Sequence, residues 1–484
     1  MSAFTENSPK PPLLPAAGST GSDSSVDGAA PRDVEKAAGE PDHAEDAVFG
    51  KLEGGKALDY RAVGAKGAFV LLVKVNLGLG VLGLPHAFGV LGLVPGILCI
   101  LVIQTIFCYC ALMIGRFKIA HPQVYTVSDA AAVFGGRWAK EFWFFALNLQ
   151  MIFFVAAACV GVSTALNAVS AHGACTAIFI AVAGVLAFLF GSIPTLGAIT
   201  WIGWAGLASI LAAVFTVTVA TGVQSRPSLA PATGPFDKNV KMFGDATFAQ
   251  AMAAINQILF AYGSTPMFFG IASEMREPRK FTHSMVASIG FLTTVYLVVG
   301  VVVYHYCGQY VASPSLGSAG PLLKKICYGI AIPGLLASMT LFTHMASKNI
   351  FVRALAGSRH LAANTPTHWA AWLGITAGCA LIGYVIASAI PIFDSLISII
   401  GALVVPTLSV IPYTFMWWHD NYRYVPAGQR TLRKHLHFAL NIVILAIAFF
   451  LTAAGTYGAV DDLINTTNNS GPWTCHDNSG TVKD

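Results

Sequence analysis

Two short stretches of this sequence combine apolar residues with glycine and proline in a pattern that exposes backbone groups. The first reads N-L-G-L-G-V-L-G-L-P over residues 76–85, and the second reads A-Y-G-S-T-P-M over residues 261–267. Glycine loosens a helix and proline removes a backbone donor, so a helix through either stretch is interrupted. An interruption frees N–H and C=O groups that an intact helix bonds internally. These freed groups are candidates for binding a polar ligand.

An α-amino acid fits both kinds of freed group. Amides at the amino end of a half-helix favour a carboxylate, and carbonyls at a carboxyl end favour an ammonium or a small cation. The predicted amide donors are Gly78, Gly80 and Val81. The predicted carbonyl acceptors are Tyr262, Gly263 and Ser264. The alternative is that glycine and proline only allow close helix packing. Two such stretches, each with polar residues at the break, favour a substrate site.

The surrounding sequence is that of a membrane protein. Of its 484 residues, 55% are apolar and 11% are charged, and the mean hydropathy is +0.66, which is far from soluble-protein usage. Apolar runs of about 20 residues, the length that crosses the hydrocarbon core, recur along the chain. We predict eleven spans, at 66–90, 92–115, 140–168, 174–191, 199–223, 249–272, 283–306, 321–346, 369–389, 392–417 and 436–460. Interrupted backbone inside a bilayer persists only in a protein interior or along a cavity, so the interruptions in spans one and six predict an internal site.

The placement of Lys and Arg predicts the orientation of these spans. Five loops on one side carry most of the basic residues, so we expect that side, with the N-terminus, to face the cytosol. Two glycosylation sequons fall on the opposite side and make Asn465 and Asn468 candidate modification sites. Cys175, Cys307 and Cys475 also fall near that side, where a disulfide persists, and a Cys307–Cys475 bridge is one hypothesis for them.

The composition divides the chain into four segments. Residues 1–60 predict a disordered cytosolic tail, 61–435 a ten-helix core, 436–460 an eleventh helix, and 461–484 an extracytosolic tail. No Cys/His cluster, catalytic motif or phosphate loop occurs in the sequence. We therefore predict no enzyme, no metal and no cofactor. The expected partners are a small-molecule amino acid and the lipid bilayer, with no nucleic acid, and the sequence does not indicate an oligomeric state.

Spans one and six lie five spans apart, so their breaks run in opposite directions through the membrane. Interrupted spans at matching places of two halves are typical of transporters with inverted repeats. Four motifs resemble the amino acid/auxin permease family, and Lys74 before the first motif resembles its fungal branch of neutral and aromatic amino acid permeases. These motifs, within residues 60 to 420, are N-L-G-L-G-V-L-G-L-P-H-A-F, F-A-Y-G-S-T-P-M-F, S-E-M-R-E-P-R-K-F and P-I-F-D-S-L-I-S-I-I-G-A-L. The resemblance implies an all-α polytopic fold of the leucine-transporter type, a five-plus-five inverted repeat with discontinuous helices 1 and 6.

Polar residues near the first and second breaks are candidates for coupling or gating. Asn76 either contacts substrate or a cation, or makes an ordinary interhelical hydrogen bond. Lys74 lies about 12 Å along the helix from Lys66, within snorkelling reach of the inner surface. Its ammonium either snorkels or turns inward as a cation or gate charge. Glu274 ends span six and is either a gate or coupling carboxylate or a salt-bridged loop charge.

Span eight supplies three further candidates. By the resemblance, hydroxyls of this span hold an ion against the broken part of span one, which points to Thr340 and Thr343. His344 is a candidate proton acceptor, since an unperturbed histidine has a pKa of about 6.5. The alternative for His344 is a packing or hydrogen-bonding role.

These interpretations predict a secondary active transporter of neutral or aromatic amino acids that works by alternating access. The predicted coupling ion is the proton (H+), because of the fungal resemblance and the titratable Glu274 and His344, and sodium (Na+) is the alternative. Other readings are an amino-acid-binding nutrient sensor and a vacuolar amino acid exporter or exchanger. The predicted location is the plasma membrane, with the vacuolar membrane as the alternative.

Overall fold

The chain is helical throughout the part that the structure describes. The structure is a computed structural model, and it describes residues 63–194, 196–231, 233–361, 363–426, 428, 430–467 and 471–481. The predicted tail at 1–60 and the candidate glycosylation site Asn468 lie outside these residues. Within them, extended pairing is limited to an isolated parallel bridge between Val63 and Met275. The predicted all-α fold is confirmed.

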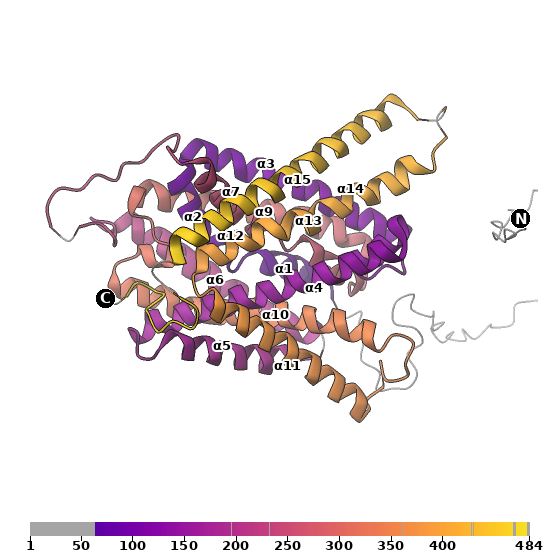
Figure 1. Ribbon diagram of the computed structural model, residues 1–484, viewed down its shortest axis with the longest axis horizontal. Helices are drawn as coiled ribbons and strands as arrows, with labels where there is room; N and C mark the ends of the chain where they lie inside the picture. The colour runs from indigo at the N-terminus through magenta and orange to yellow at the C-terminus, as the bar shows by residue number, and fades with distance from the viewer. Residues whose placement is uncertain are drawn as a thin grey trace, which may run out of the picture. The chain divides into compact units, whose positions relative to one another are not determined.

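Helices occupy every predicted span, and the long ones run side by side in roughly one direction (Figure 1). The continuous ones are α3 (Leu93–Ala120), α4 (Val127–Ser170), α5 (Thr176–Gly191), α6 (Leu196–Val223), α9 (Phe281–Cys307), α10 (Pro321–Ala354), α11 (Pro366–Ala389) and α15 (Leu432–Thr467). Seven helices of the described part are long and apolar enough to cross a membrane, or up to nine if each of two bent pairs is one span. The chain is therefore polytopic, while the count of eleven and the inverted repeat stay predictions.

Three of the predicted spans are interrupted. The first consists of α1 (Ala65–Asn76) and α2 (Gly80–Leu91), and the second of α7 (Phe248–Tyr262), the 3-10 turn η1 (Thr265–Met267) and α8 (Phe268–Ser273). Both breaks lie where the glycine and proline residues predict them. The third comprises α12 (Phe393–Leu403), α13 (Val405–Ser409) and α14 (Ile411–Trp418), and it ends in the π-helix η5 (His419–Arg423). The predicted span at 392–417 is thus divided into pieces, because Pro406 and Pro412 each lie in the first turn of a new helix.

Local sequence explains where several helices begin. Thr126 and Asp129 form a reciprocal capping box at the start of α4, and Thr247 and Gln250 form another at the start of α7. Short 3-10 turns lie in the connections on either side of α9, at η2 (Pro278–Lys280), η3 (Gly308–Tyr310) and η4 (Ser315–Ser318). The capping box of α7 fixes the start of the helix whose other end carries the second break.

The loops gather at two ends, as the predicted alternation of spans requires. At one end, the Val63 amide donates to Glu274 O at 3.1 Å and Arg353 pairs with Glu141 at 2.5 Å. We call this the Glu274 end; it contains the loops predicted to face the cytosol. At the other, the Lys324 ammonium donates to Ser479 O at 2.6 Å and Gln309 bonds Asp237 O at 2.9 Å. We call this the Cys475 end, and the membrane side of each end stays a prediction.

The disulfide of the Cys475 end differs from the predicted one. Cys175 and Cys475 are bonded, whereas Cys307 is a buried free thiol, so the Cys307–Cys475 hypothesis is wrong. The reason is the path of residues 471–481, which pack on α4 and α5 rather than on the end of α9. The bonds that hold this path include Asn167 Nδ2 to Asn478 Oδ1 at 2.8 Å, Thr176 to His476 O at 2.6 Å and Trp473 N to Ser388 O at 2.9 Å.

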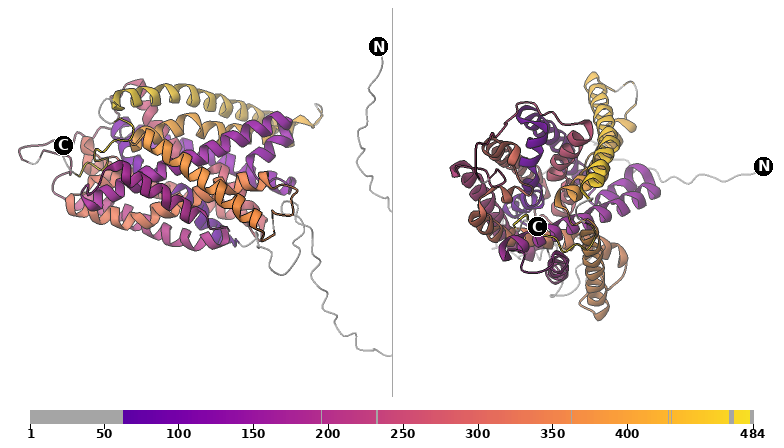
Figure 2. Two further views of the ribbon diagram at one scale, coloured as in Figure 1. Left: turned by 60° about the horizontal axis from the view of Figure 1, so that its bottom comes forward. Right: turned by 60° about the vertical axis from the view of Figure 1, so that its left-hand side comes forward.

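The last helix lies at the edge of the bundle in both views of Figure 2. α15 extends to Thr467, beyond the predicted boundary at residue 460, so Asn465 lies within its last turns. The Asn465 side chain is exposed and bonds Asp461 at 3.2 Å. Its glycosylation stays a prediction. The extension also carries Asp462 to a pocket described below.

Candidate substrate and ion site at the helix breaks

The first break places the start of α2 directly against the end of α7. α1 and α2 are bent by 46° around the turn at residues 77–79. A Cβ on Gly80 would lie 2.5 Å from the Cα of Ala261, so glycine permits this approach. Gly80 and Val81 are the first residues of α2, and the amides of a first helical turn have no partner inside the helix. Gly78 lies in the turn itself.

Lys74 turns inward at this break. Its side chain is 0% exposed, and its Nζ donates to Leu77 O at 3.1 Å and to Ser338 Oγ of α10 at 2.6 Å. Among the residues that the structure describes, no carboxylate pairs with this ammonium. The side chain therefore does not snorkel. Its charge sits at the carboxyl end of α1, where freed carbonyls and the helix dipole favour a cation.

Two hydroxyl groups connect the first break to the second. Ser264 donates from its Oγ to Val75 O at 2.7 Å. The Tyr296 hydroxyl lies 3.0 Å from Asn76 O and 2.9 Å from Ala261 O. Because a tyrosine hydroxyl has one proton, the carboxyl ends of α1 and α7 share that proton. The two breaks therefore form one hydrogen-bonded unit.

The carbonyls predicted to receive a substrate amine already accept hydrogen bonds from the protein. Gly263 O accepts from Gln150 Nε2 of α4 at 2.9 Å and from Ser409 Oγ of α13 at 3.0 Å. The other two bonds are Thr265 Oγ1 to Tyr262 O at 3.2 Å and the Met267 amide to Ser264 O at 3.0 Å. A carbonyl oxygen accepts two hydrogen bonds, so a substrate amine has to displace a donor at Gly263 O, which already accepts two. No sequence spacing links Gln150 or Ser409 to Gly263.

Aromatic rings pack around the second break. The ring pairs are Phe154 with Phe260 at 5.1 Å, Phe154 with Phe342 at 5.0 Å, Tyr262 with Tyr296 at 5.2 Å and Tyr262 with Phe107 at 6.1 Å between centroids. Such edge-to-face and tilted pairs are favoured by the ring quadrupoles. They give the break an apolar lining.

The span-eight hydroxyl at the first break is Ser338 rather than either predicted threonine. Thr340 Oγ1 donates to Leu336 O at 2.8 Å, and Thr343 Oγ1 donates to Met339 O at 2.8 Å, both within α10. These bonds hold the two threonines to their own helix, and neither contacts the break. Ser338 lies on a different face of α10 from the two threonines. The family resemblance alone does not tell which face of this helix meets the first break.

Asn76 and His344, two further polar candidates, lie apart from each other. Asn76 donates from Nδ2 to Leu72 O at 3.0 Å in its own helix, while its Oδ1 is buried without a partner among the described residues. His344 is buried, donates from Nδ1 to Ile193 O at 2.8 Å, and packs edge-on against Trp372. Asn76 is thus part of the first break, and His344 is not.

Glu274 forms a buried ion pair at the Glu274 end of the protein. Its carboxylate pairs with the Lys348 ammonium of α10 at 2.5 Å and accepts from the Tyr125 hydroxyl at 3.2 Å. The Glu274 side chain is 3% exposed and that of Lys348 is 6% exposed. Removing one partner of a buried pair leaves an uncompensated charge, which costs about 3–5 kcal/mol. The pair connects the end of α8 to α10, and the Glu274 backbone also bonds the Val63 amide.

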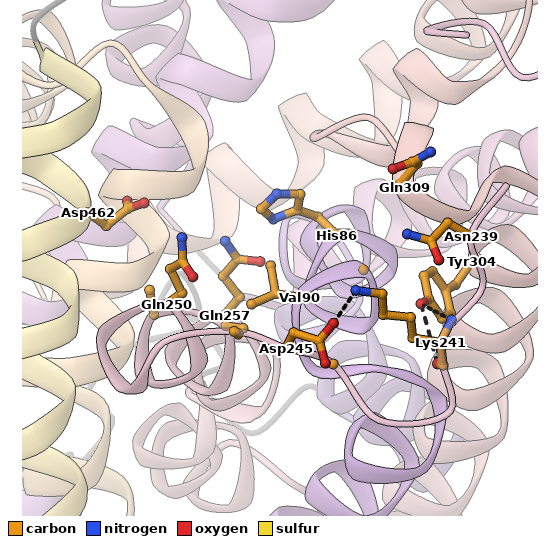
Figure 3. A pocket seen from close by; sticks show the side chains of 15 residues that line it. His86, Val90, Asn239, Lys241, Asp245, Gln250, Gln257, Tyr304, Gln309 and Asp462 are labelled. Carbon is orange, nitrogen blue, oxygen red and sulfur yellow. Dashed lines mark hydrogen bonds and ion pairs between the residues drawn. The ribbon is translucent and has the colours of Figure 1, made fainter. Parts of the chain in front are cut away.

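A pocket of about 450 Å³ opens between α2 and α7 on the Cys475 side of the breaks (Figure 3). Figure 3 shows polar side chains gathered around it, with His86 from α2, Gln250 and Gln257 from α7, and Asp462 from α15. The full lining is His86, Gly89, Val90, Asn239, Lys241, Gly244, Asp245, Ala246, Gln250, Ala253, Ala254, Gln257, Tyr304, Gln309 and Asp462. No residue of the predicted site is among them.

The pocket reaches to within one helical turn of the first break. A Cβ on Gly83 would lie 3.7 Å from Gln257 Oε1, and Gly83 follows Gly80 by three residues. Gln257 Oε1 and His86 Nδ1 are buried atoms without hydrogen-bond partners among the described residues. Buried polar atoms of this kind are expected to have a partner, so both are suited to bind a polar ligand or water.

Comparison with known proteins identifies the family. The family model described as transmembrane amino acid transporter protein matches residues 61–460. A transmembrane transporter of Gibberella moniliformis is 33% identical over 429 residues, covering 88% of this chain and 90% of that protein. The N amino acid transport system protein of Neurospora crassa is 32% identical over 410 residues, covering 84% and 86%. Both helix breaks lie inside the matched residues. With its apolar helices and interrupted spans, the chain is an integral multi-pass membrane protein that belongs to the transmembrane amino acid transporter family.

Proposed function

We propose that this protein is a secondary active transporter that moves neutral or aromatic amino acids by alternating access, driven by a proton gradient. The family and the printed name of the Neurospora relative support amino acids as the substrate class. The aromatic lining of the second break supports apolar side chains as cargo. In this proposal the substrate binds between the two breaks, with its carboxylate at the Gly80 and Val81 amides.

One observation carries the choice of the proton. The Lys74 ammonium lies between Leu77 O and Ser338 Oγ, at the carboxyl end of a half-helix. A sodium ion at the same place would compete with this charge for the same two oxygens. A buried charge without a counter-ion is costly, and releasing the proton removes that cost. Lys74 is therefore the group that we expect to bind and release the coupling proton.

The two ends supply the rest of the cycle. The buried Glu274–Lys348 pair is the proposed inner gate, which has to separate before the substrate leaves toward the cytosol. The pocket between α2 and α7 is the proposed entry route, because it ends one helical turn from Gly80. Substrate binding favours the closed arrangement only to the extent that it binds that arrangement more tightly. The Tyr296 hydroxyl bonds carbonyls at both breaks, so we expect a movement of either break to change its hydrogen bonds.

The test is uptake by purified protein in proteoliposomes, with a panel of amino acids. We expect an inward proton gradient to drive accumulation of neutral and aromatic amino acids, and a sodium gradient at symmetric pH to drive none. Accumulation driven by sodium alone would overturn proton coupling. Saturable binding of an amino acid without any flux would favour the nutrient sensor instead.

The location of the protein and the direction of transport are a separate part of the proposal. We propose the plasma membrane and net import. Labelling of the intact cell surface through an epitope at the Cys475 end tests both this location and the predicted orientation. Signal confined to the vacuole would favour the exporter or exchanger.

A further inference from the structure

Three metal-ligating side chains converge at the Glu274 end, away from the helix breaks. His121 Nε2 lies 3.0 Å from Asp420 Oδ1, and His419 Nδ1 lies 2.8 Å from the same oxygen. The ligand atoms of the three residues all lie within 4.8 Å of one another. Among the described residues, this is the group of three His, Cys, Asp or Glu side chains that is close enough to hold a metal ion.

Two distant elements build this cluster. His121 caps the end of α3, and His419 and Asp420 begin the π-helix η5 after α14. A π-turn is wider than an α-turn and occurs frequently at functional sites. The Phe117 ring packs on His121 at 4.3 Å, and the Tyr424 ring packs on His419 at 5.2 Å between centroids. These contacts hold both imidazoles in place from outside the cluster.

We propose that His121, His419 and Asp420 form a binding site for a divalent transition-metal cation, with Zn²⁺ as the best match. Two imidazoles and one carboxylate are ligands that Zn²⁺ accepts, and water completes a tetrahedral set. Ligand atoms around tetrahedral Zn²⁺ lie about 3.3 Å apart, given bonds of about 2.0–2.1 Å. The two nitrogen-to-oxygen separations of 2.8 and 3.0 Å lie close to that spacing, and all three ligand atoms lie within 4.8 Å of one another.

Metal binding at this cluster requires each imidazole to present an unprotonated nitrogen to the cation. Both ring nitrogens that now face Asp420 Oδ1 have to be unprotonated to ligate, so each ring keeps its proton on the other nitrogen. The nearby cations face elsewhere. Lys118 donates to Val124 O at 2.5 Å, and the Arg423 guanidinium lies over the Trp418 ring at 5.2 Å. The Asp420 carboxylate is thus the charged group that faces the bound cation.

Metal binding would connect two elements that are distant in the sequence. A metal held by all three side chains joins the end of α3 to the turn after α14 at the Glu274 end. The proposal does not depend on the coupling ion or on the substrate, since none of the three residues contacts either helix break.

The test is calorimetric titration of the purified full-length protein with ZnCl₂ after treatment with a chelator. We expect one high-affinity Zn²⁺ per chain and a rise in the melting temperature on binding. His121→Asn, His419→Asn and Asp420→Asn should each weaken binding by at least about 10–100-fold, because loss of a hydrogen-bond partner behind a ligand already costs that much. His283→Asn, an exposed histidine near the start of α9, should leave binding unchanged.

Two results would overturn the site. One is the absence of Zn²⁺ binding by the wild-type protein, and the other is equal affinity in the wild type and the three cluster variants. Melting temperatures without metal show whether each variant is folded. Asp420→Asn keeps an oxygen acceptor for both imidazoles, so it separates loss of the metal from loss of the hydrogen bonds.

Discussion

The two helix breaks look alike in sequence and differ in the groups that hold them. At the first, a charged side chain from the same helix, Lys74, reaches Leu77 O and Ser338 Oγ. At the second, neutral groups from two other helices, Gln150 and Ser409, bond Gly263 O. Glycine and proline therefore open the backbone in both places, while the side chains that fill the opening decide its chemistry. In our proposal the first break binds and releases the coupling proton, and the second shapes the substrate site.

The largest expected effect comes from removing the charge of the first break. Lys74→Met keeps an unbranched side chain of similar length but has no ammonium. We expect proton-driven accumulation in proteoliposomes to fall to the level of protein-free vesicles. The matched change at the second break is Gln150→Met, which removes a neutral hydrogen bond worth about 1 kcal/mol. We expect this variant to lower uptake by about fivefold.

The outcome that contradicts this comparison is proton-driven accumulation that persists in Lys74→Met. Melting temperatures of the two variants provide the control for folding. Equal loss of accumulation in both would indicate that the breaks act as one structural unit without a special role for the charge.

A second prediction compares the two glycines that lie at the breaks. A Cβ at Gly80 meets the backbone Cα of Ala261 at 2.5 Å, whereas one at Gly263 meets the side-chain Cγ2 of Val405 at 2.6 Å. Backbone moves less readily than the end of a side chain, so Gly80→Ala should be the more damaging substitution. Overpacking costs about 1–3 kcal/mol, and we expect Gly80→Ala near the upper value and Gly263→Ala near the lower.

Thermal unfolding in one detergent measures both glycine variants under the same conditions. The reverse order of melting temperatures would show that the approach of α2 to α7 is adjustable. That result would also weaken the assignment of Gly80 and Val81 as amide donors, since their positions depend on this contact.

The smallest expected effect separates the two serine hydroxyls. Ser338 bonds a charged group and Ser409 a neutral carbonyl, and hydrogen bonds to charged groups contribute about 1.5–3 kcal/mol against about 0.5–1.5 kcal/mol for neutral ones. Ser338→Ala should therefore lower the free energy of unfolding more than Ser409→Ala. Denaturant titration of both variants checks the order, and identical losses would argue that Lys74 carries no charge in the folded protein.

Two differences between the predictions and the structure have a common cause. Thr340 and Thr343 follow Ser338 on the same helix, yet only Ser338 faces the first break. The choice depends on the rotation of α10 about its own axis, which the packing of neighbouring helices sets. Cys175 rather than Cys307 bonds Cys475 for the same kind of reason, because the path of residues 471–481 decides which thiol is near.

The membrane class, the helical segments and the positions of two breaks follow from local sequence alone. These are local properties, since apolar runs and the backbone preferences of glycine and proline act over a few residues. Only the tertiary structure decided the partners. Lys74 and Ser338 are 264 residues apart, and His121 and Asp420 are 299 apart, so no spacing pattern joins them. Contacts at such separations follow from how the helices pack and rotate, and that arrangement sets which of the polar residues meet.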